Sequence, residues 1–526
     1  MILPTLSTLA PILVLLGFAA LIGVLHLFKR GSSTLWIVAA LGALFAWIFV
    51  FLNYRNFDIS IQIMPWNFNS QYELSPTIQF NWYSWSYALA IITLLLSSLL
   101  TSIINAGAKR WITWIMSLIL GAFGLWSVLA LNPVTLVLAW AAMDICVLVI
   151  VIGLITDGQA IKRAVVVFSI NILAVLLLSW STLIEYPLSS EGFSGNQEMY
   201  VSLLAIAVIG LRVGGTTILS PVIKGSDFSK SLGSLLHLVP VAAAFALFNT
   251  IQTLSFPAGV ELMLVVVISM IVFFNAFSWV WKANSPRHQA NWIILMVGFS
   301  LVSVIRGDLD ASLAWGVALI LSGGILFLVS VNYRYLFLIT GIGLINISML
   351  PYTPTWVGTQ LFAPPFSWGL LILLFSHILI LFGYIQNTHK SDNNKEKIDR
   401  FTWAIYLWGL LLLPIVHMLI GFLMRDSAPV GLSSWIGFLS SGAALSIFLV
   451  HHFYPKLRIW SYNGNRFMPT LQKLINISWF WKSLVSLYRG LGRLVDLITK
   501  VLEGDGGILW TLLLLVLFIT LIRQFR

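Results

Sequence analysis

Ionisable side chains inside apolar stretches are the residues of this sequence that point most directly to chemistry. Arg212 and His237 lie between Leu203 and Asn249, a stretch that is apolar enough to cross a bilayer twice apart from one short polar loop. A charged group at membrane depth is costly, so it usually faces a protein interior or a water-filled cavity. The two side chains therefore predict a polar site near the middle of a membrane. The alternative is a structural arginine that pairs with a neighbouring carboxylate or with backbone carbonyls.

Glycine and proline residues predict breaks in two of the helices that would cross the membrane. A helix can break within a membrane where protein groups or a cavity satisfy the backbone groups that lose their partners. One break is expected next to Arg212, and a second in the apolar run that begins at Tyr335. The residues predicted to break the two helices are Gly214, Gly215 and Pro221 in the first and Pro351 and Pro354 in the second.

The composition indicates an all-α polytopic membrane protein. Of the 526 residues, 59% are hydrophobic and 9% are charged, whereas soluble proteins carry about 25% charged residues. At roughly 20 residues for each helical span, the apolar runs predict about sixteen transmembrane helices. The net charge of +11 comes from basic residues spread over short loops. That pattern is typical of topology signals, so we expect no nucleic-acid partner.

The sequence contains no pattern that predicts a cofactor or a metal ion. Its single cysteine, Cys146, lies in an apolar run, which excludes an internal disulfide and a thiol cluster for a metal or an iron–sulfur centre. There is no nucleotide-binding loop, and His451 and His452 lie at a membrane edge, where they are not a credible pair of haem ligands. We therefore expect no cofactor, no metal and no catalytic residues of a soluble enzyme.

The basic residues also predict the topology. Lys29 and Arg30 separate the first two apolar runs, which places their loop in the cytoplasm and the N-terminus outside. Most of the 29 Lys and Arg residues fall on cytoplasmic segments when the spans alternate from that start. We therefore expect a multi-pass protein of an energy-transducing cell membrane, in contact with the lipid bilayer.

Three segments outside the spans have patterns of their own. Asn53–Gln79 contains alternating residues that predict a small external hairpin, and the hydrophilic segment Thr388–Arg400 is expected to be a cytoplasmic connector. In Leu471–Leu502, basic and apolar residues alternate with near-helical spacing. This predicts an amphipathic helix on the cytoplasmic face, which lies either against lipid or on the protein's own surface.

Four stretches of the sequence occur in an order that one family shares. They are Phe80–Ser84, which opens the third span, Leu211–Pro221 with Leu235–His237 in the seventh and eighth spans, Leu350–Gly358 in the twelfth, and the amphipathic segment followed by a last span. With the number of spans, they resemble the antiporter-like membrane subunits of respiratory complex I, an NADH:quinone oxidoreductase, and of multisubunit cation/proton antiporters. The terminal segment is similar to the lateral helix of the largest such subunit, though shorter.

The resemblance implies an inverted pair of five-helix repeats, about Trp111–Thr250 and Val260–Ile385, each with one broken helix. In that family, a row of Glu, Lys and His side chains along the middle of the membrane relays protons. The expected divisions of the chain are 1–110 for three helices with an external loop, 111–255 and 256–386 for the repeats, 387–400 for the connector, 401–466 for further helices, 467–503 for the amphipathic lateral helix and 504–526 for a terminal span.

The residues at the matched relay positions depart from the family pattern. Arg212 occupies the seventh-span Lys position, and arginine stays protonated at any relevant pH, so it cannot release a proton. The fifth-span Glu falls near Ala141, but Asp144 lies three residues on and hence on the same helix face. The other matched residues are Asn81 for an Asp, His237 for the eighth-span His, and Gly323 and Thr359 for the Lys residues of the eleventh and twelfth spans.

We therefore predict a degenerate relay whose remaining proton-path candidates are Asp144, Arg212, His237 and His377, with His417 as a further polar group. We also predict that Arg212 is buried and pairs with Asp144. Histidines in apolar helices are more often hydrogen-bonded and structural, which is the alternative for His377 and His417.

Three functions fit these observations. The first is a membrane subunit of a proton-translocating complex related to NADH:quinone oxidoreductase, with proton transfer weakened or lost. The second is a stand-alone cation/proton antiporter or other secondary transporter, in which Arg212 binds an anionic substrate. The third is a purely structural scaffold. The terminal amphipathic segment favours the first, because the family's lateral helix braces neighbouring subunits. We therefore expect other membrane subunits of a respiratory or antiporter complex as partners.

Overall fold

The computed structural model describes residues 2–453 with internal gaps, together with Gly490 and Arg493. The gaps fall at residues 30, 56, 58, 64–74, 105–109, 156, 186–194, 225–229, 252–253, 282–287, 330–335, 389–398 and 428–430. Apart from Gly490 and Arg493, the predicted amphipathic helix at 467–503 lies outside the described residues, as do the last span at 504–526 and most of the connector at 387–400.

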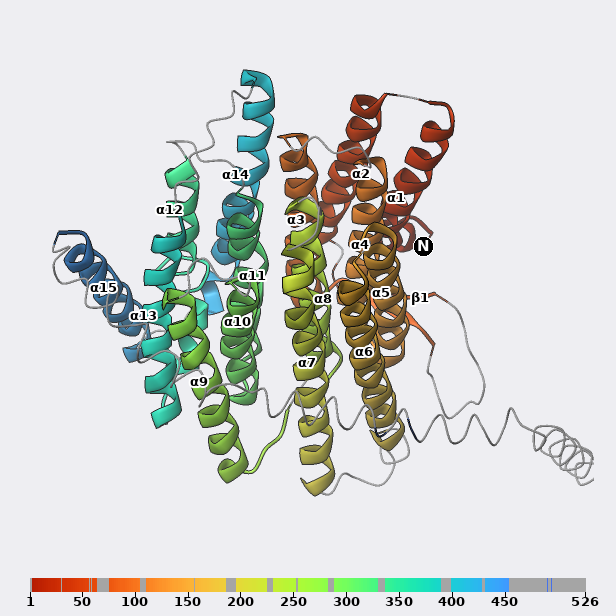
Figure 1. Cartoon of the computed structure of the whole chain (residues 1–526). Coiled ribbons are helices and arrows are strands. Elements are labelled where there is room, and N and C mark those ends of the chain that lie inside the picture. The colour runs from red at the N-terminus through yellow and green to blue at the C-terminus, as the bar shows by residue number, and fades with distance from the viewer. Residues whose placement is uncertain are drawn as a thin grey trace, which may run out of the picture. The chain divides into compact units, whose positions relative to one another are not determined.

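Long apolar helices, shown in Figure 1, make up most of the described structure. The first eight are α1 (Ile2–Leu27), α2 (Ser32–Leu52), α3 (Trp82–Thr101), α4 (Arg110–Val128), α5 (Pro133–Leu154), α6 (Gly158–Glu185), α7 (Gly195–Lys224) and α8 (Lys230–Thr250). The others are α9 (Ala258–Trp281), α10 (His288–Ile305), α11 (Leu309–Leu328), α12 (Leu336–Asn346), α13 (Trp368–Thr388), α14 (Arg400–Leu423) and α15 (Leu432–Phe453).

Within the described chain, 13 helices are long and apolar enough to cross a membrane. This confirms the prediction of an all-α polytopic membrane protein. α12 is shorter, and α15 contributes the apolar segment Trp435–Leu449. The short helices η1 (Asn53–Arg55), η2 (Ser102–Ile104), η4 (Val357–Phe362) and η5 (Arg425–Ser427) lie between the long ones.

Polar side chains fix where several of these helices begin. Asn81 caps α3 by accepting from the Ser84 amide at 2.7 Å, and Ser84 in turn accepts from the Asn81 amide. Asn132 caps α5 by accepting from the Thr135 amide at 2.9 Å, with Pro133 as the first helical residue. Such caps satisfy amide groups that have no partner within the helix. The local sequence therefore favours these helix starts, and Asn81 and Asn132 also bond to residues far away in the sequence.

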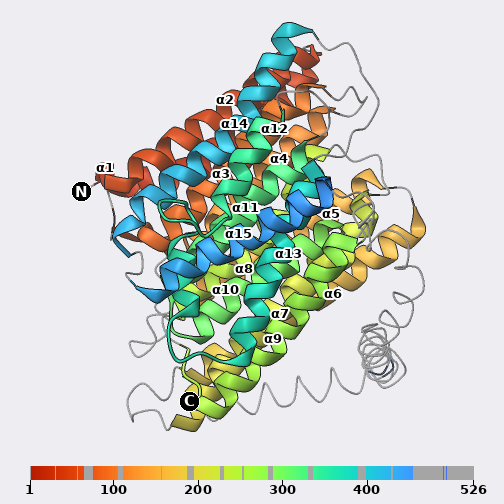
Figure 2. The same ribbon diagram turned by 90° about the vertical axis from the view of Figure 1, so that its left-hand side faces the viewer.

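Four helices form the centre of the bundle, namely α3, α8, α10 and α11. The apolar window of α8 is 100% buried and that of α11 is 94% buried, whereas the windows of α1 and α2 are 33% buried. α8 packs against α3, α4 and α11, and α3 also packs against α14. Figure 1 shows α1 and α2 at the opposite edge of the bundle from α15, and Figure 2 shows α15 crossing α13.

Two groups of five helices share one pattern of neighbours. From α4 to α8, each helix packs against the next, and α4 also packs against α8. From α9 to α13, the same sequence of contacts recurs and α9 packs against α13. This is the arrangement expected of two five-helix repeats. The boundaries at 111–255 and 256–386 remain a prediction.

A small hairpin lies between α2 and α3, as the alternating residues predict. β1 (Ser60–Gln62) and β2 (Thr77–Gln79) are antiparallel, with Ile61 opposite Ile78. The Gln79 amide donates to the Leu129 carbonyl at 2.9 Å, and the Leu131 amide donates to the Thr77 carbonyl at 3.1 Å. The hairpin is therefore joined to the turn between α4 and α5.

The seventh span is one continuous helix, so the break predicted at Gly214, Gly215 and Pro221 is wrong. α7 keeps a helical backbone along its whole length. A membrane helix tolerates Gly and Pro where neighbouring groups restore the lost backbone partners. Gly215 instead permits close packing, because a Cβ there would lie 2.7 Å from the side-chain oxygen of Asn171 on α6.

The twelfth span is broken in the region of Pro351 and Pro354. α12 ends at Asn346, and turns follow as far as η4. Met349 and Tyr352 have φ angles of 57° and 65°, and a left-handed conformation costs a residue other than glycine roughly 1–2 kcal/mol. The broken segment therefore needs groups from other helices to hold it.

Neighbouring helices supply those groups. His377 on α13 donates from Nε2 to the Ile347 carbonyl at 2.9 Å. The Ser441 hydroxyl on α15 donates to the Ser348 carbonyl at 2.7 Å. These bonds satisfy two of the carbonyl groups that the end of α12 leaves without helical partners.

Two glycines allow α14 and α15 to approach the broken segment. A Cβ on Gly421 would overlap the backbone of Pro354, and a Cβ on Gly437 would overlap the carbonyl oxygen of Met349. Backbone atoms cannot rotate away as a flexible side chain can. Both glycines are therefore required by close approach and not by a turn.

We predict that Gly437→Ala destabilises the folded protein by ~1–3 kcal/mol, the usual cost of overpacking. Gly442→Ala on the same helix is the matched control, because a Cβ there meets no atom within 4 Å. Thermal unfolding of the purified protein in detergent should show a lower Tm for the first variant and no decrease for the second. Equal midpoints for the two variants would contradict this account of α15 packing.

Candidate functional site

Asp144 on α5 and Arg212 on α7 form a buried ion pair, which confirms the predicted pairing. Nη1 and Nη2 of Arg212 donate to the two different oxygens of the Asp144 carboxylate, each at 3.0 Å. Both side chains are at most 2% exposed. This two-bond geometry suits the planar guanidinium and is among the stronger hydrogen-bonded arrangements in proteins.

Two further side chains complete the surroundings of the pair. Asn171 on α6 donates from Nδ2 to an oxygen of Asp144 at 3.0 Å. The Arg212 guanidinium carbon lies 4.2 Å from the centre of the Trp140 ring, within the range of a cation–π contact. Trp140 in turn donates from Nε1 to the Ala243 carbonyl on α8 at 3.0 Å. Four consecutive helices, α5 to α8, therefore hold the pair in place.

Asp144 and Arg212 are also the two formally charged side chains among the buried residues of the described chain. An isolated charge in a membrane interior costs several kcal/mol or more, and pairing offsets that cost. The pairing therefore offsets the cost of burying each of the two groups.

His237, another of the predicted proton-path candidates, lies on α8. Its Nδ1 donates to the Gly233 carbonyl at 2.6 Å, and its ring centre lies 6.0 Å from that of Phe327 on α11. Among the described residues, no hydrogen bond or ion pair joins His237 to Asp144 or Arg212. The structure therefore does not join His237 directly to the ion pair.

The other two candidate histidines also have separate partners. His377 serves the broken segment after α12, and its ring centre lies 5.7 Å from that of Trp315. The Nδ1 atom of His417 on α14 lies 3.3 Å from the hydroxyl oxygen of Ser322 on α11. These contacts join both residues to groups on neighbouring elements and not to the ion pair.

The two matched lysine positions of the second half lie in closely packed surroundings. A Cβ on Gly323 would overlap the indole ring of Trp292 on α10. Thr359 is fully buried in η4, and its hydroxyl donates to the Trp356 carbonyl at 2.7 Å. Neither position carries an ionisable group.

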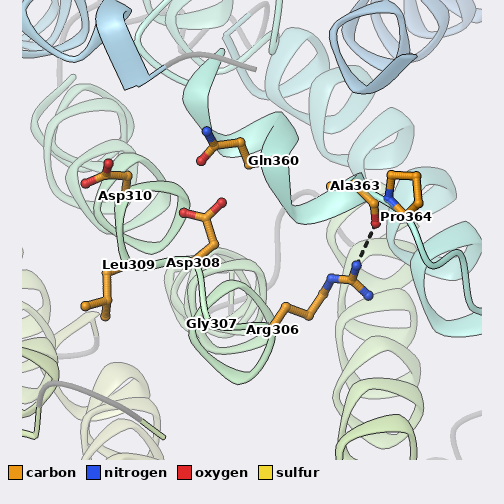
Figure 3. Close-up of a pocket in the computed structure, with 8 residues that line it drawn as sticks. All are labelled: Arg306, Gly307, Asp308, Leu309, Asp310, Gln360, Ala363 and Pro364. Carbon is orange, nitrogen blue, oxygen red and sulfur yellow. Dashed lines mark hydrogen bonds between the residues drawn. The ribbon is translucent and has the colours of Figure 1, made fainter. Parts of the chain in front are cut away.

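A pocket of about 590 Å³ lies beside the turn between α10 and α11 (Figure 3). Arg306 extends across it and donates to the Ala363 carbonyl at 2.6 Å. Burial lowers the pKa of Arg306, against the opposing effects of Glu261 and Asp308, and burial also raises the pKa of Asp308. Arg306 therefore ties this turn to the segment that follows η4, and the pocket is separate from the ion pair.

Comparison with solved structures gives three related folds. A chain of the Mrp complex from Dietzia sp. matches with a TM-score of 0.69 and 13% identity, over 98% of this chain and 62% of that one. A chain of the membrane-bound sulfane sulfur reductase, an archaeal respiratory membrane complex, matches with a TM-score of 0.66 and 14% identity, over 98% of this chain and 100% of that one. A chain of respiratory complex I from Thermus thermophilus matches with a TM-score of 0.61 and 15% identity, over 80% of this chain and 100% of that one.

The chain has the antiporter-like fold. The resemblance predicted from the four sequence stretches is thus confirmed at the level of the fold. No protein-family model and no curated protein sequence matches the chain. This chain spans 62% of the length of the matched Dietzia chain.

The residues that surround the ion pair were not predicted from the sequence. Asn171 is the clearest example, since it is an amide in the middle of the apolar run of α6. Its position signalled a polar contact within the bundle, but its partner Asp144 is 27 residues away in the sequence. Trp140 gave no such signal, because a tryptophan in an apolar helix is usually a packing residue.

We predict that Arg212→Ala destabilises the protein by ~3–5 kcal/mol, because it leaves Asp144 charged and unpaired in the interior. The double variant Asp144→Asn/Arg212→Gln should be more stable than Arg212→Ala, since it removes both charges together. The measurement is the Tm and the yield of folded protein after extraction in detergent.

The matched control is Arg425→Ala. Arg425 pairs with Asp426 at 3.4 Å, but their side chains are 53% and 92% exposed, and exposed pairs contribute only ~0–1 kcal/mol. If the two single arginine variants unfold at the same temperature, the buried pair does not stabilise the fold as described.

Proposed function

We propose that the chain is a membrane subunit of a proton-translocating respiratory complex related to NADH:quinone oxidoreductase, and that its own proton relay is degenerate. The single observation that carries this proposal is the Asp144–Arg212 pair within an antiporter-like fold. The resemblance expects a lysine at the position of Arg212 and a glutamate near Ala141, three residues before Asp144.

Arginine changes what such a pair can do. A relay needs groups that bind and release protons near the working pH. Burial can tune a lysine into that range, whereas arginine stays protonated. Here the guanidinium occupies both carboxylate oxygens of Asp144, and Asn171 adds a third donor. In this proposal the pair is a fixed structural unit and does not relay protons.

The second half supports the same conclusion. Gly323 and Thr359 provide no titratable group, and the described buried residues include no lysine and no glutamate. His237 and His377 each donate to a backbone carbonyl within the bundle. A continuous proton path through these residues would need water to bridge every gap between them.

The wider assembly is inferred from the related folds. All three matched chains belong to membrane complexes, which supports other membrane subunits as the partners of this chain. In this proposal the protein lies in an energy-transducing membrane with its N-terminus outside. The predicted amphipathic helix at 467–503 would brace a neighbouring subunit.

We predict that the purified parent complex, reconstituted in vesicles, keeps its proton-to-electron ratio when His237 is changed to Ala. The reason is that no proton passes through His237 if the relay is degenerate. Arg212→Lys is the comparison variant, because it restores a cation that can titrate at the same place. A fall in the ratio on His237→Ala, with assembly intact, would show that protons do pass through this subunit.

Purification through an affinity tag on the chain separates the subunit from a stand-alone transporter. A subunit should bring other membrane proteins with it in fixed proportion, as identified by mass spectrometry. A chain that purifies alone and catalyses cation/proton exchange in vesicles would overturn the proposal in favour of an independent antiporter.

A further inference from the structure

Aromatic rings lie directly on glycines in the second half of the bundle. At each of these glycines, a Cβ would overlap an indole ring or a phenol hydroxyl from another helix. Such contacts bring a flat ring against the helix backbone and leave no void between them. The pairs are Gly323 with Trp292, Gly343 with Tyr384, and Gly383 with Trp279.

The three rings also contact one another. The ring centre of Trp292 lies 5.7 Å from that of Trp279 and 5.9 Å from that of Tyr384. All three side chains are fully buried. Trp292 is the central member, and its Nε1 donates to the Leu319 carbonyl on α11 at 3.1 Å. His288, at the start of α10, stacks on Trp279 at 3.6 Å.

The cluster lies near one end of the second half. Trp279 is close to the end of α9, Tyr384 is close to the end of α13, and Trp292 is in the first turns of α10. Gly323 is close to the end of α11. Ser322, the residue before Gly323 on α11, lies beside His417 on α14. A polar pair therefore lies next to the ring contacts.

Two polar atoms of the cluster lie close to glycine backbones. The Trp279 indole nitrogen and the Tyr384 hydroxyl have no hydrogen-bond partner among the described residues. A buried water needs room for itself and two to four polar partners. Here the backbones of Gly383 and Gly343 take up the space beside these atoms.

We propose that Trp279, Trp292 and Tyr384 form a seal that keeps water out of the second half of the bundle at the end where α9, α11 and α13 finish. Trp292 is its central residue, because it contacts both other rings and covers Gly323. Apolar constrictions exclude water by this means in membrane channels. The seal does not depend on the proposed function, since it concerns water entry and not assembly or proton transfer.

The test uses the full chain in native membranes. The membranes are permeabilised so that the reagent reaches both of their faces. Cys146→Ser removes the only cysteine, and Ser322→Cys then places a nearly isosteric thiol beside Gly323. A charged, water-soluble methanethiosulfonate reagent labels a thiol only where water can reach it. We expect the Ser322→Cys chain to resist labelling, and added Trp292→Ala to raise its labelling rate by about tenfold or more, as local opening to solvent would.

Three variants make the result specific. Gln159→Cys, at an exposed position, sets the rate of full access. Trp180→Ala is the matched control, because that tryptophan is 60% exposed on α6 and its loss should leave Ser322→Cys unlabelled. Trp292→Phe should remain sealed, since a phenyl ring fills most of the same space.

Two outcomes overturn the seal. One is a Ser322→Cys chain that labels as fast as Gln159→Cys while Trp292 is present. The other is a folded Trp292→Ala chain that stays unlabelled. If Trp292→Ala does not fold, Trp292→Leu keeps the site apolar but reduces its volume, and the same two readings apply to it.

Discussion

The burial of one carboxylate and one guanidinium is the constraint around which the first half of this protein is built. Leaving either charge unpaired in the folded interior is costly, because removing an ion from water costs more than most single contacts return. The surrounding residues follow from that requirement. Asn171 adds a donor to the carboxylate, Trp140 covers the cation, and Gly215 leaves room for the Asn171 side chain. Four helices are thereby tied to one point.

The second half meets the same requirement for polar groups by other means. The break after Asn346 leaves backbone carbonyls without helical partners, and neutral side chains on neighbouring helices pair with two of them. Its aromatic rings occupy the space beside small residues such as Gly323 and Gly358. The two groups of five helices share one pattern of neighbours but differ in their interiors. One contains a pair of charged side chains, and the other contains aromatic rings packed on small residues.

The membrane-helix architecture could be predicted from the sequence, because apolar runs of membrane length are local signals. The Asp144–Arg212 pair was also predictable, since two lone charges in neighbouring spans have few other partners. The wrong prediction was the break at Gly214 and Gly215. A Gly-Gly pair has the same helix propensity whether it breaks a helix or lets a neighbouring helix pack closely. The position of Asn171 on α6 distinguishes the two cases here. Ring-on-glycine contacts are equally invisible, because they join residues from different helices.

The separation of the two charges along the chain has a consequence for biosynthesis. Asp144 and Arg212 are 68 residues apart, so at ~5–20 residues per second the ribosome needs about 3–14 s to make the second after the first. During that interval α5 enters the membrane with its carboxylate unpaired, at a cost of ~2.5–3.5 kcal/mol that its otherwise apolar residues must offset. Asn171 on α6 emerges first and supplies the earliest partner. The order of synthesis thus makes α5 and α6 a provisional hairpin that the arrival of α7 completes.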